Sequence, residues 1–210
     1  MFRIETITDE VVRSASQGSA EDCERILKAF TPEVFAMIAV RFAPTPAQFH
    51  AVEELAQESL MALSKGLANL RSPTMNGLRS YASGIVTRKV ATFLKEAHPN
   101  RSARVFSLDS STQHAAIAGP LRELLTASGL TPRSALVQVE ETGRVIEALA
   151  KLKPSYREVI TLSFFDQLSM DETAERMDLT RPAASMLLMR AMKALREFAT
   201  DHRSEDESHG

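Results

Sequence analysis

The sequence predicts an all-α protein made of two small helical domains joined by a flexible linker. Apolar residues recur at intervals of three and four along most of the 210 residues, whereas the apolar-polar alternation of half-buried strands is hard to find. Between residues 98 and 135 this periodicity fades, and Ser, Thr, Pro, Gly and Gln become frequent. The length allows two domains, because domains usually run about 100 to 150 residues and can be smaller.

The first domain is expected to span residues 1–97. Helices are expected at residues 8–17, 19–30, 31–42, 48–70 and 78–97, with breaks at Gly18, at the start of the third helix and at the proline-containing residues 43–46. The fourth helix carries an apolar stripe that should face the core: Ala56, Leu60, Leu63, Leu67 and Leu70. The fifth is expected to bury Leu78, Ala82, Ile85, Val86 and Phe93.

The second domain is expected to span residues 136–200. Helical periodicity resumes at residues 136–152, 154–165, 169–177 and 180–198. The linker, residues 98–135, can form only a short helix at 121–127, and residues 201–210 are expected to be a disordered acidic tail.

Several classes of protein are excluded by simple features. The longest apolar run, residues 35–40, is far shorter than the roughly 20 residues that span a bilayer, and the N-terminus lacks the basic and apolar regions of a secretory signal. Cys23 is the only cysteine, so no intrachain disulfide forms and a cytoplasmic protein is expected. The five histidines are scattered and no glycine-rich phosphate loop is present, so we expect no enzyme, metal site or cofactor.

Residues 169–198 have the pattern of a helix-turn-helix. Ser169 and Glu172 form a capping box at one helix start, and Thr180 can cap the next helix, whose first turn tolerates Pro182. The second helix directs Ala184, Leu188, Ala191 and Leu195 inward, and it directs Pro182, Ser185, Met186, Met189, Arg190 and Lys193 outward. In such motifs the outward N-terminal face enters the major groove. An ordinary helical hairpin is the alternative.

Three runs in this domain, ALAKLKPSYREVI at 148–160, LSMDETAE at 168–175 and KALRE at 193–197, resemble region four of the extracytoplasmic-function sigma factors. The resemblance implies recognition of the upstream promoter element by Arg181, Ser185, Met186, Met189, Arg190 and Lys193. The chain departs from the family at the two methionines and at Asp178, which replaces the usual turn glycine. The methionines either contact thymine methyl groups or bind a protein such as an anti-sigma factor.

The run EELAQESL at residues 53–60 resembles the acidic signature of region two of the same family. In the family this helix face docks on the clamp helices of the largest polymerase subunit, which implies that Glu54, Gln57, Glu58 and Met61 bind polymerase. A solvated acidic helix face is the alternative reading of the charges alone.

The helix LRSYASGIVTRKVATFLK at residues 78–95 resembles the promoter-melting helix of the family. It lies in a basic segment in which Arg79, Arg88, Lys89, Lys95, Arg101 and Arg104 face a single acid, Glu96. The resemblance implies contacts to separated DNA from Tyr81, Arg88, Thr92 and Lys95, and base capture by Thr74 and Asn76 in the preceding loop. Tyr81 can equally pack in the core, and Asn76 can equally be a turn residue.

Taken together, these features predict a transcription initiation factor whose partners are core RNA polymerase and promoter DNA. Two competing functions remain. A sigma-like adaptor would keep the fold but bind a protein in place of DNA, which the methionines favour. A dimeric helix-turn-helix repressor would leave the acidic helix and the first domain unexplained.

Overall fold

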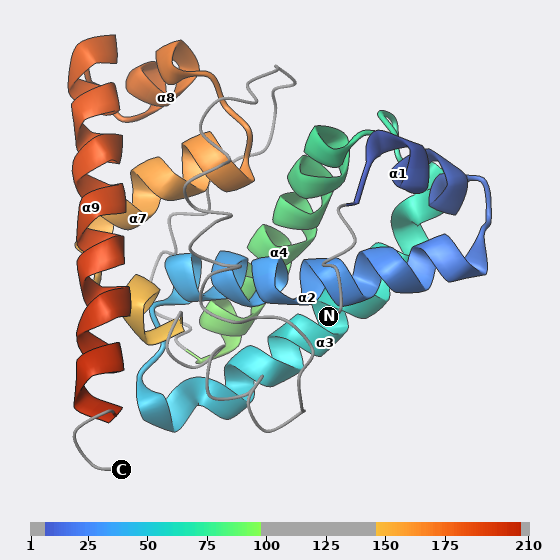
Figure 1. Cartoon of the computed structure of the whole chain (residues 1–210), viewed down its shortest axis with the longest axis horizontal. Coiled ribbons are helices and arrows are strands. Elements are labelled where there is room, and N and C mark those ends of the chain that lie inside the picture. The colour runs from blue at the N-terminus through green and yellow to red at the C-terminus, as the bar shows by residue number, and fades with distance from the viewer. Residues whose placement is uncertain (1–6, 98–145, 207–210) are drawn as a thin grey trace.

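The structure is a computed structural model that describes residues 7–97 and 146–206, and within those residues every regular element is helical (Figure 1). The predicted all-α class is therefore confirmed. The described helices form an N-terminal group, α1 to α4, and a C-terminal group, which begins at residue 146 and contains α7 to α9. The linker and its expected helix at 121–127 lie outside the described residues.

The N-terminal group contains α1 (Asp9–Ser16), α2 (Ala20–Phe42), α3 (Phe49–Gly66) and α4 (Met75–Ala97), with short 3₁₀ turns η1 (Pro46–Gln48) and η2 (Leu67–Asn69). Side-chain caps begin the first two helices: Thr8 accepts from the amide of Val11, and Ser19 accepts from that of Asp22. Helices α2, α3 and α4 contact one another around fully buried side chains that include Ile26, Phe30, Met37, Leu63 and Leu78.

Separate helices were expected at residues 19–30 and 31–42, but residues 20–42 form the single helix α2, with Pro32 inside it. Proline removes an amide donor, so a break was expected there. Phe30 and Val34, on either side of the proline, are each 1% exposed, and this burial anchors both halves of the helix in one core. The Thr31 hydroxyl also donates to the carbonyl of Leu27 at 2.8 Å. Tertiary packing therefore outweighs the local helix-breaking signal.

The C-terminal group contains a helical segment at residues 146–151, α7 (Pro154–Ile160), a π-helical turn η3 (Thr161–Phe165), α8 (Met170–Arg176) and α9 (Arg181–Asp206). The helix expected at 154–165 thus changes its hydrogen bonding after Ile160, and the amide of Asp166 donates to the Thr161 carbonyl at 2.8 Å. Helix α9 continues to residue 206, into the expected tail, because no proline or glycine interrupts residues 183–206. Residues 207–210 lie outside the described residues.

The two groups lie against each other. Helix α2 contacts α7 and η3, α4 contacts η3, and the buried apolar residues of both groups form one continuous cluster. Figure 1 shows α7 between α9 and the N-terminal group, and α9 on the outer side. Among the described residues, no helix has the length and apolar character needed to cross a membrane.

Candidate polymerase and DNA interfaces

Helix α3 presents the predicted polymerase-binding residues on one exposed face. Residues spaced three and four apart share a helix face, and the buried face of α3 carries Leu55, Ala56 and Leu63. All four predicted residues are exposed: Glu54, Gln57, Glu58 and Met61. Met61 is 60% exposed although it is apolar. Methionine is enriched at protein interfaces whereas carboxylates are depleted there, so Met61 is the residue of this face whose exposure favours a protein partner.

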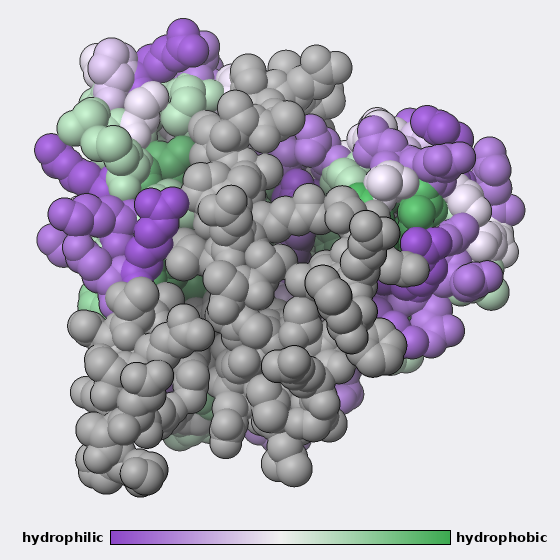
Figure 2. Space-filling view, viewed as in Figure 1, coloured by the Kyte–Doolittle hydropathy of each residue, from purple (hydrophilic) through white to green (hydrophobic). Residues whose placement is uncertain are grey.

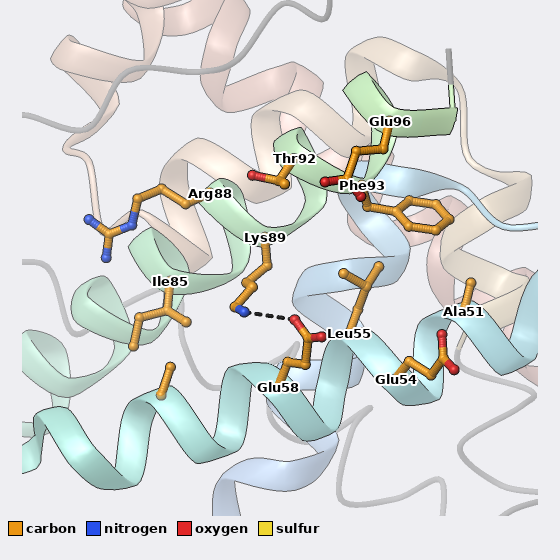
Figure 3. A pocket seen from close by; sticks show the side chains of 11 residues that line it. Ala51, Glu54, Leu55, Glu58, Ile85, Arg88, Lys89, Thr92, Phe93 and Glu96 are labelled. Atoms are coloured by element: carbon orange, nitrogen blue, oxygen red, sulfur yellow. Dashed lines mark hydrogen bonds and ion pairs between the residues drawn. The ribbon is translucent and has the colours of Figure 1, made fainter. Parts of the chain in front are cut away.

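A groove of about 520 Å³ separates this face from α4. Its α3 side carries Glu54 and Glu58, and its α4 side carries Arg88, Lys89 and Thr92. Figure 3 shows the ammonium of Lys89 reaching the carboxylate of Glu58, at 2.7 Å, while Arg88 points away from this pair. Both members of the ion pair are substantially exposed, so the pair contributes little to stability. Arg88 keeps its charge available for another partner.

Helix α4 exposes only the second half of the predicted DNA-contacting face. Arg88, Thr92 and Lys95 are exposed. Tyr81 is half-buried and packs against α3, where a Cβ added to Gly66 would lie 2.1 Å from the tyrosine hydroxyl. The ring therefore occupies the space that a small residue at position 66 leaves open, and it is less accessible to a base than the three residues beyond it.

The loop before α4 is held by hydrogen bonds. The Thr74 hydroxyl accepts from the amide of Gly77 at 3.1 Å, and the Asp9 carboxylate, from α1, accepts from the amide of Met75 at 2.8 Å. Thr74 thus acts as a helix cap, and its side chain is already engaged. Asn76 is half-buried and has no hydrogen-bond partner among the described residues. Of the two predicted base-contacting residues, Asn76 is the one whose polar groups remain available.

The basic segment exposes less positive charge than its composition indicates, because Arg79 is buried. Its side chain is 3% exposed, and its guanidinium donates to both oxygens of Glu33 at 2.9 and 3.2 Å. Lys89 is paired with Glu58, as described above. Among the described residues of the segment, Arg88 and Lys95 are the cations that make no ion pair. Arg101 and Arg104 lie outside the described residues.

The helix-turn-helix forms as predicted. Ser169 and Glu172 make both hydrogen bonds of the capping box, at 2.8 and 3.1 Å, and Asp178 has the left-handed φ of 55° that the turn requires. The Thr180 hydroxyl accepts from the amide of Ala183 at 3.4 Å and begins α9. The inward residues are at most 5% exposed: Ala184, Leu188, Ala191 and Leu195.

The outward face of α9 combines cations with exposed methionines. All the predicted residues are exposed: Arg181, Pro182, Ser185, Met186, Met189, Arg190 and Lys193. Met186 is 45% exposed and Met189 is 59% exposed, with Leu179 of the turn at 38%. Figure 2 shows hydrophobic surface among hydrophilic surface over α8 and α9. The arginine at position 181 lies 3.6 Å from Asp171 in a well exposed pair, so its charge is only loosely held.

One polar cluster escaped prediction because its members are far apart in the sequence. Arg41 of α2 donates to Asp166 at 2.8 Å and to the hydroxyl of Thr87 at 3.0 Å, and it also donates to the hydroxyl of Ser83. Arg41 and Asp166 are 125 residues apart. Burial lowers the pKa of Arg41, and the Asp166 carboxylate opposes that shift. No local motif signals such a contact.

Comparison with known proteins agrees with this arrangement. A family model described as sigma-70, region 4, matches residues 142–195, which include the helix-turn-helix. The chain is also 26% identical over 156 residues to the ECF RNA polymerase sigma factor SigW of Bacillus subtilis (strain 168), an alignment that covers 72% of this chain and 77% of that protein. The alignment is too long to be confined to the helix-turn-helix region. The chain is therefore similar to sigma-70 region 4 over its helix-turn-helix and to an extracytoplasmic-function sigma factor over most of its length.

Proposed function

We propose that this protein is an RNA polymerase sigma factor that directs promoter recognition and transcription initiation in the cytoplasm. Residues 1–97 serve as the region-two domain, which binds core polymerase and holds separated DNA. Residues 136–200 serve as the region-four domain, which binds upstream duplex, and residues 98–135 link the two. The mechanism requires binding and DNA deformation but no covalent chemistry, cofactor or metal.

The observation that carries this proposal is the agreement between the family match and the exposed helix-turn-helix. The match covers the capping box, the turn and the helix that exposes Arg181, Ser185 and Arg190. Arginine can donate two hydrogen bonds to guanine or pair with phosphate, so this face has the chemistry of a major-groove reader.

The N-terminal group supplies two further surfaces. On α3, Glu54, Gln57, Glu58 and Met61 form the proposed polymerase-binding face. On α4, Arg88 and Lys95 offer unpaired cations for phosphates of the melted strand, with Thr92 between them. Asn76 is the proposed base-contacting residue of the preceding loop, while Thr74 and Tyr81 support the structure around it.

The proposal is tested by run-off transcription with purified core polymerase. We expect that Arg88→Ala with Lys95→Ala impairs open-complex formation by at least about tenfold while polymerase binding is unchanged, because two phosphate contacts are lost. The matched control is Arg13→Ala with Lys28→Ala, which removes two exposed cations from α1 and α2. Loss of polymerase binding in the first variant, or equal losses in both variants, would contradict the assignment.

The exposed methionines of α9 favour one second candidate, a sigma-like adaptor whose C-terminal group binds a protein such as an anti-sigma factor. Met186 and Met189 lie where direct reading of bases would be expected. Footprinting with and without core polymerase separates the possibilities. A sigma factor protects the promoter only with polymerase, a repressor protects DNA alone, and an adaptor protects no DNA.

A further inference from the structure

We propose that Asp9 is a positioning residue for base recognition, because its carboxylate, on α1, fixes the first turn of α4 and with it the side chain of Asn76. The inference rests on the proposed function, in which Asn76 contacts a base of the melted segment. The contact between α1 and α4 on which it is built lies within the N-terminal group alone.

The start of α4 is held by side chains from two places in the chain. Thr74 lies just before the helix, and its hydroxyl accepts from the backbone amide of Gly77 at 3.1 Å. The amide of Met75, the first residue of α4, is one of those that have no partner inside a helix. Asp9 supplies an acceptor for it at 2.8 Å, from a position 66 residues earlier in the chain.

The Asp9 carboxylate lies at the start of two helices. Asp9 is the first residue of α1, where the Thr8 hydroxyl caps the helix by accepting from the amide of Val11. The same carboxylate contacts the first amide of α4. The N-terminal end of a helix carries partial positive charge, so a carboxylate shared by two such ends is favourable at both. Asp9 therefore ties the start of α4 to α1, whereas Thr74 ties it to its own loop.

The loop itself is compact, which limits the movement of the residues that follow it. The Thr74 amide donates to the Ser72 carbonyl at 2.9 Å, and the hydroxyls of these two residues lie 3.3 Å apart. The same carbonyl is so close to Gly77 that a Cβ at position 77 would lie 2.2 Å from it. Residues 72–77 thus form a tight turn against the beginning of α4.

Asn76 is the residue that this arrangement holds in place for a ligand. It follows Met75 directly, is half-buried, and has no hydrogen-bond partner among the described residues. An amide side chain both donates and accepts, as reading a base edge requires. Fixing its backbone in advance reduces the conformational entropy that is lost when it binds a base. Asp9 thus contributes to recognition without contacting the base.

A role in global stability is the competing interpretation of this contact. The hydrogen bond between Met75 and Asp9 is exposed, and changes at exposed positions usually alter stability only slightly. The core that holds α4 in the N-terminal group consists of fully buried side chains such as Leu78. The contact of Asp9 is therefore better explained by local ordering of the first turn of α4.

The main test measures discrimination between bases, because a loss of folded protein lowers transcription equally on all templates and leaves their ratios unchanged. One promoter that the wild type uses with core polymerase is varied to all four bases at each position of the melted segment, and run-off transcription is measured. The position whose preference disappears in Asn76→Ala is the one that Asn76 reads. The correct base there is expected to be preferred by about fivefold or more, in line with the usual cost of a mismatch.

At that position we expect Asp9→Ala to reduce the preference by about threefold or more, because ordering a side chain on binding typically costs about twofold to tenfold in affinity. Asp9→Asn should retain most of the preference, since its side-chain oxygen still accepts from the Met75 amide. The control is Glu10→Ala, which removes the neighbouring exposed carboxylate of α1. Adding Asp9→Ala to Asn76→Ala should change the ratio no further, because both residues serve one contact.

Three outcomes of this test would overturn the proposal: an undiminished preference in Asp9→Ala, an equal loss in Glu10→Ala, or preferences that Asn76→Ala leaves unaltered at every position.

A second measurement needs neither DNA nor polymerase. Hydrogen exchange at the amides of residues 75–78 in the free full chain should be faster in Asp9→Ala than in the wild type, and unchanged in Glu10→Ala. Unchanged exchange in Asp9→Ala would refute the positioning role. If the wild type transcribes from no promoter with core polymerase, the proposed function fails, and the exchange result still decides whether Asp9 fixes the start of α4.

Discussion

Two buried arginines of the N-terminal group are neutralised in different ways. Arg79 meets Glu33 of its own group, and two guanidinium nitrogens contact both carboxylate oxygens. Arg41 meets Asp166 of the other group through one nitrogen, while its remaining donors contact neutral groups nearby. The first pair can break only if the N-terminal group unfolds. The second would break if the groups separated, so similar chemistry holds one group together in one place and joins the two groups in the other.

The largest expected effect comes from breaking the ion pair between Arg79 and Glu33. Glu33→Ala leaves the Arg79 charge buried without a partner, and such changes cost about 3 to 5 kcal/mol of folding free energy. Urea unfolding followed by circular dichroism measures the loss. The matched control is Glu24→Ala on the same helix, which removes an exposed partner of Lys28 and should leave the midpoint unchanged. Equal midpoints for the two variants would show that the Arg79–Glu33 pair does not hold the fold.

A smaller effect is expected from removing the negative charge of the Arg41–Asp166 pair. Asp166→Asn keeps an oxygen acceptor for Arg41 and Ser83 but loses the carboxylate charge, so it should loosen the joint less than Asp166→Ala does. Hydrogen exchange at the amides of Phe164 and Phe165 reports this opening. We expect exchange to rise in the order wild type, Asp166→Asn, Asp166→Ala, with no change in the urea midpoint of the N-terminal group. A drop in that midpoint would mean that Asp166 supports the fold itself.

The same contrast explains which features the sequence could predict. The Thr8 cap, the capping box of Ser169 and Glu172 and the left-handed turn at Asp178 depend on neighbours a few residues away, and all are found in the structure. The inward stripe of α9 follows from helical period alone. Local pattern therefore accounts for the helix-turn-helix and for the exposed faces of α3 and α9.

Features that depend on distant partners could not be predicted in this way. Arg79 reads as a surface cation until Glu33, 46 residues away, is found beside it. The sequence leaves Tyr81 open between stacking on a base and packing in the core, and its contact with α3 at Gly66 favours packing. The continuation of α2 through Pro32 depends on burial on both sides, and the π turn depends on the contacts that Phe164 and Phe165 make with the other group.

The smallest expected effect concerns a buried hydroxyl that, unlike the two buried arginines, has no hydrogen-bond partner among the described residues. Ser59 of α3 is 1% exposed, and its hydroxyl finds no hydrogen-bond partner among the described residues. An unsatisfied buried polar group destabilises a fold, so Ser59→Ala should raise the free energy of unfolding by up to about 1 kcal/mol. Ser83→Ala is the matched comparison, because Ser83 is equally buried but bonded to Arg41 and Asp166. Urea unfolding should therefore show opposite signs for these two serines, and a loss of stability in Ser59→Ala would mean that its hydroxyl has a partner in solution.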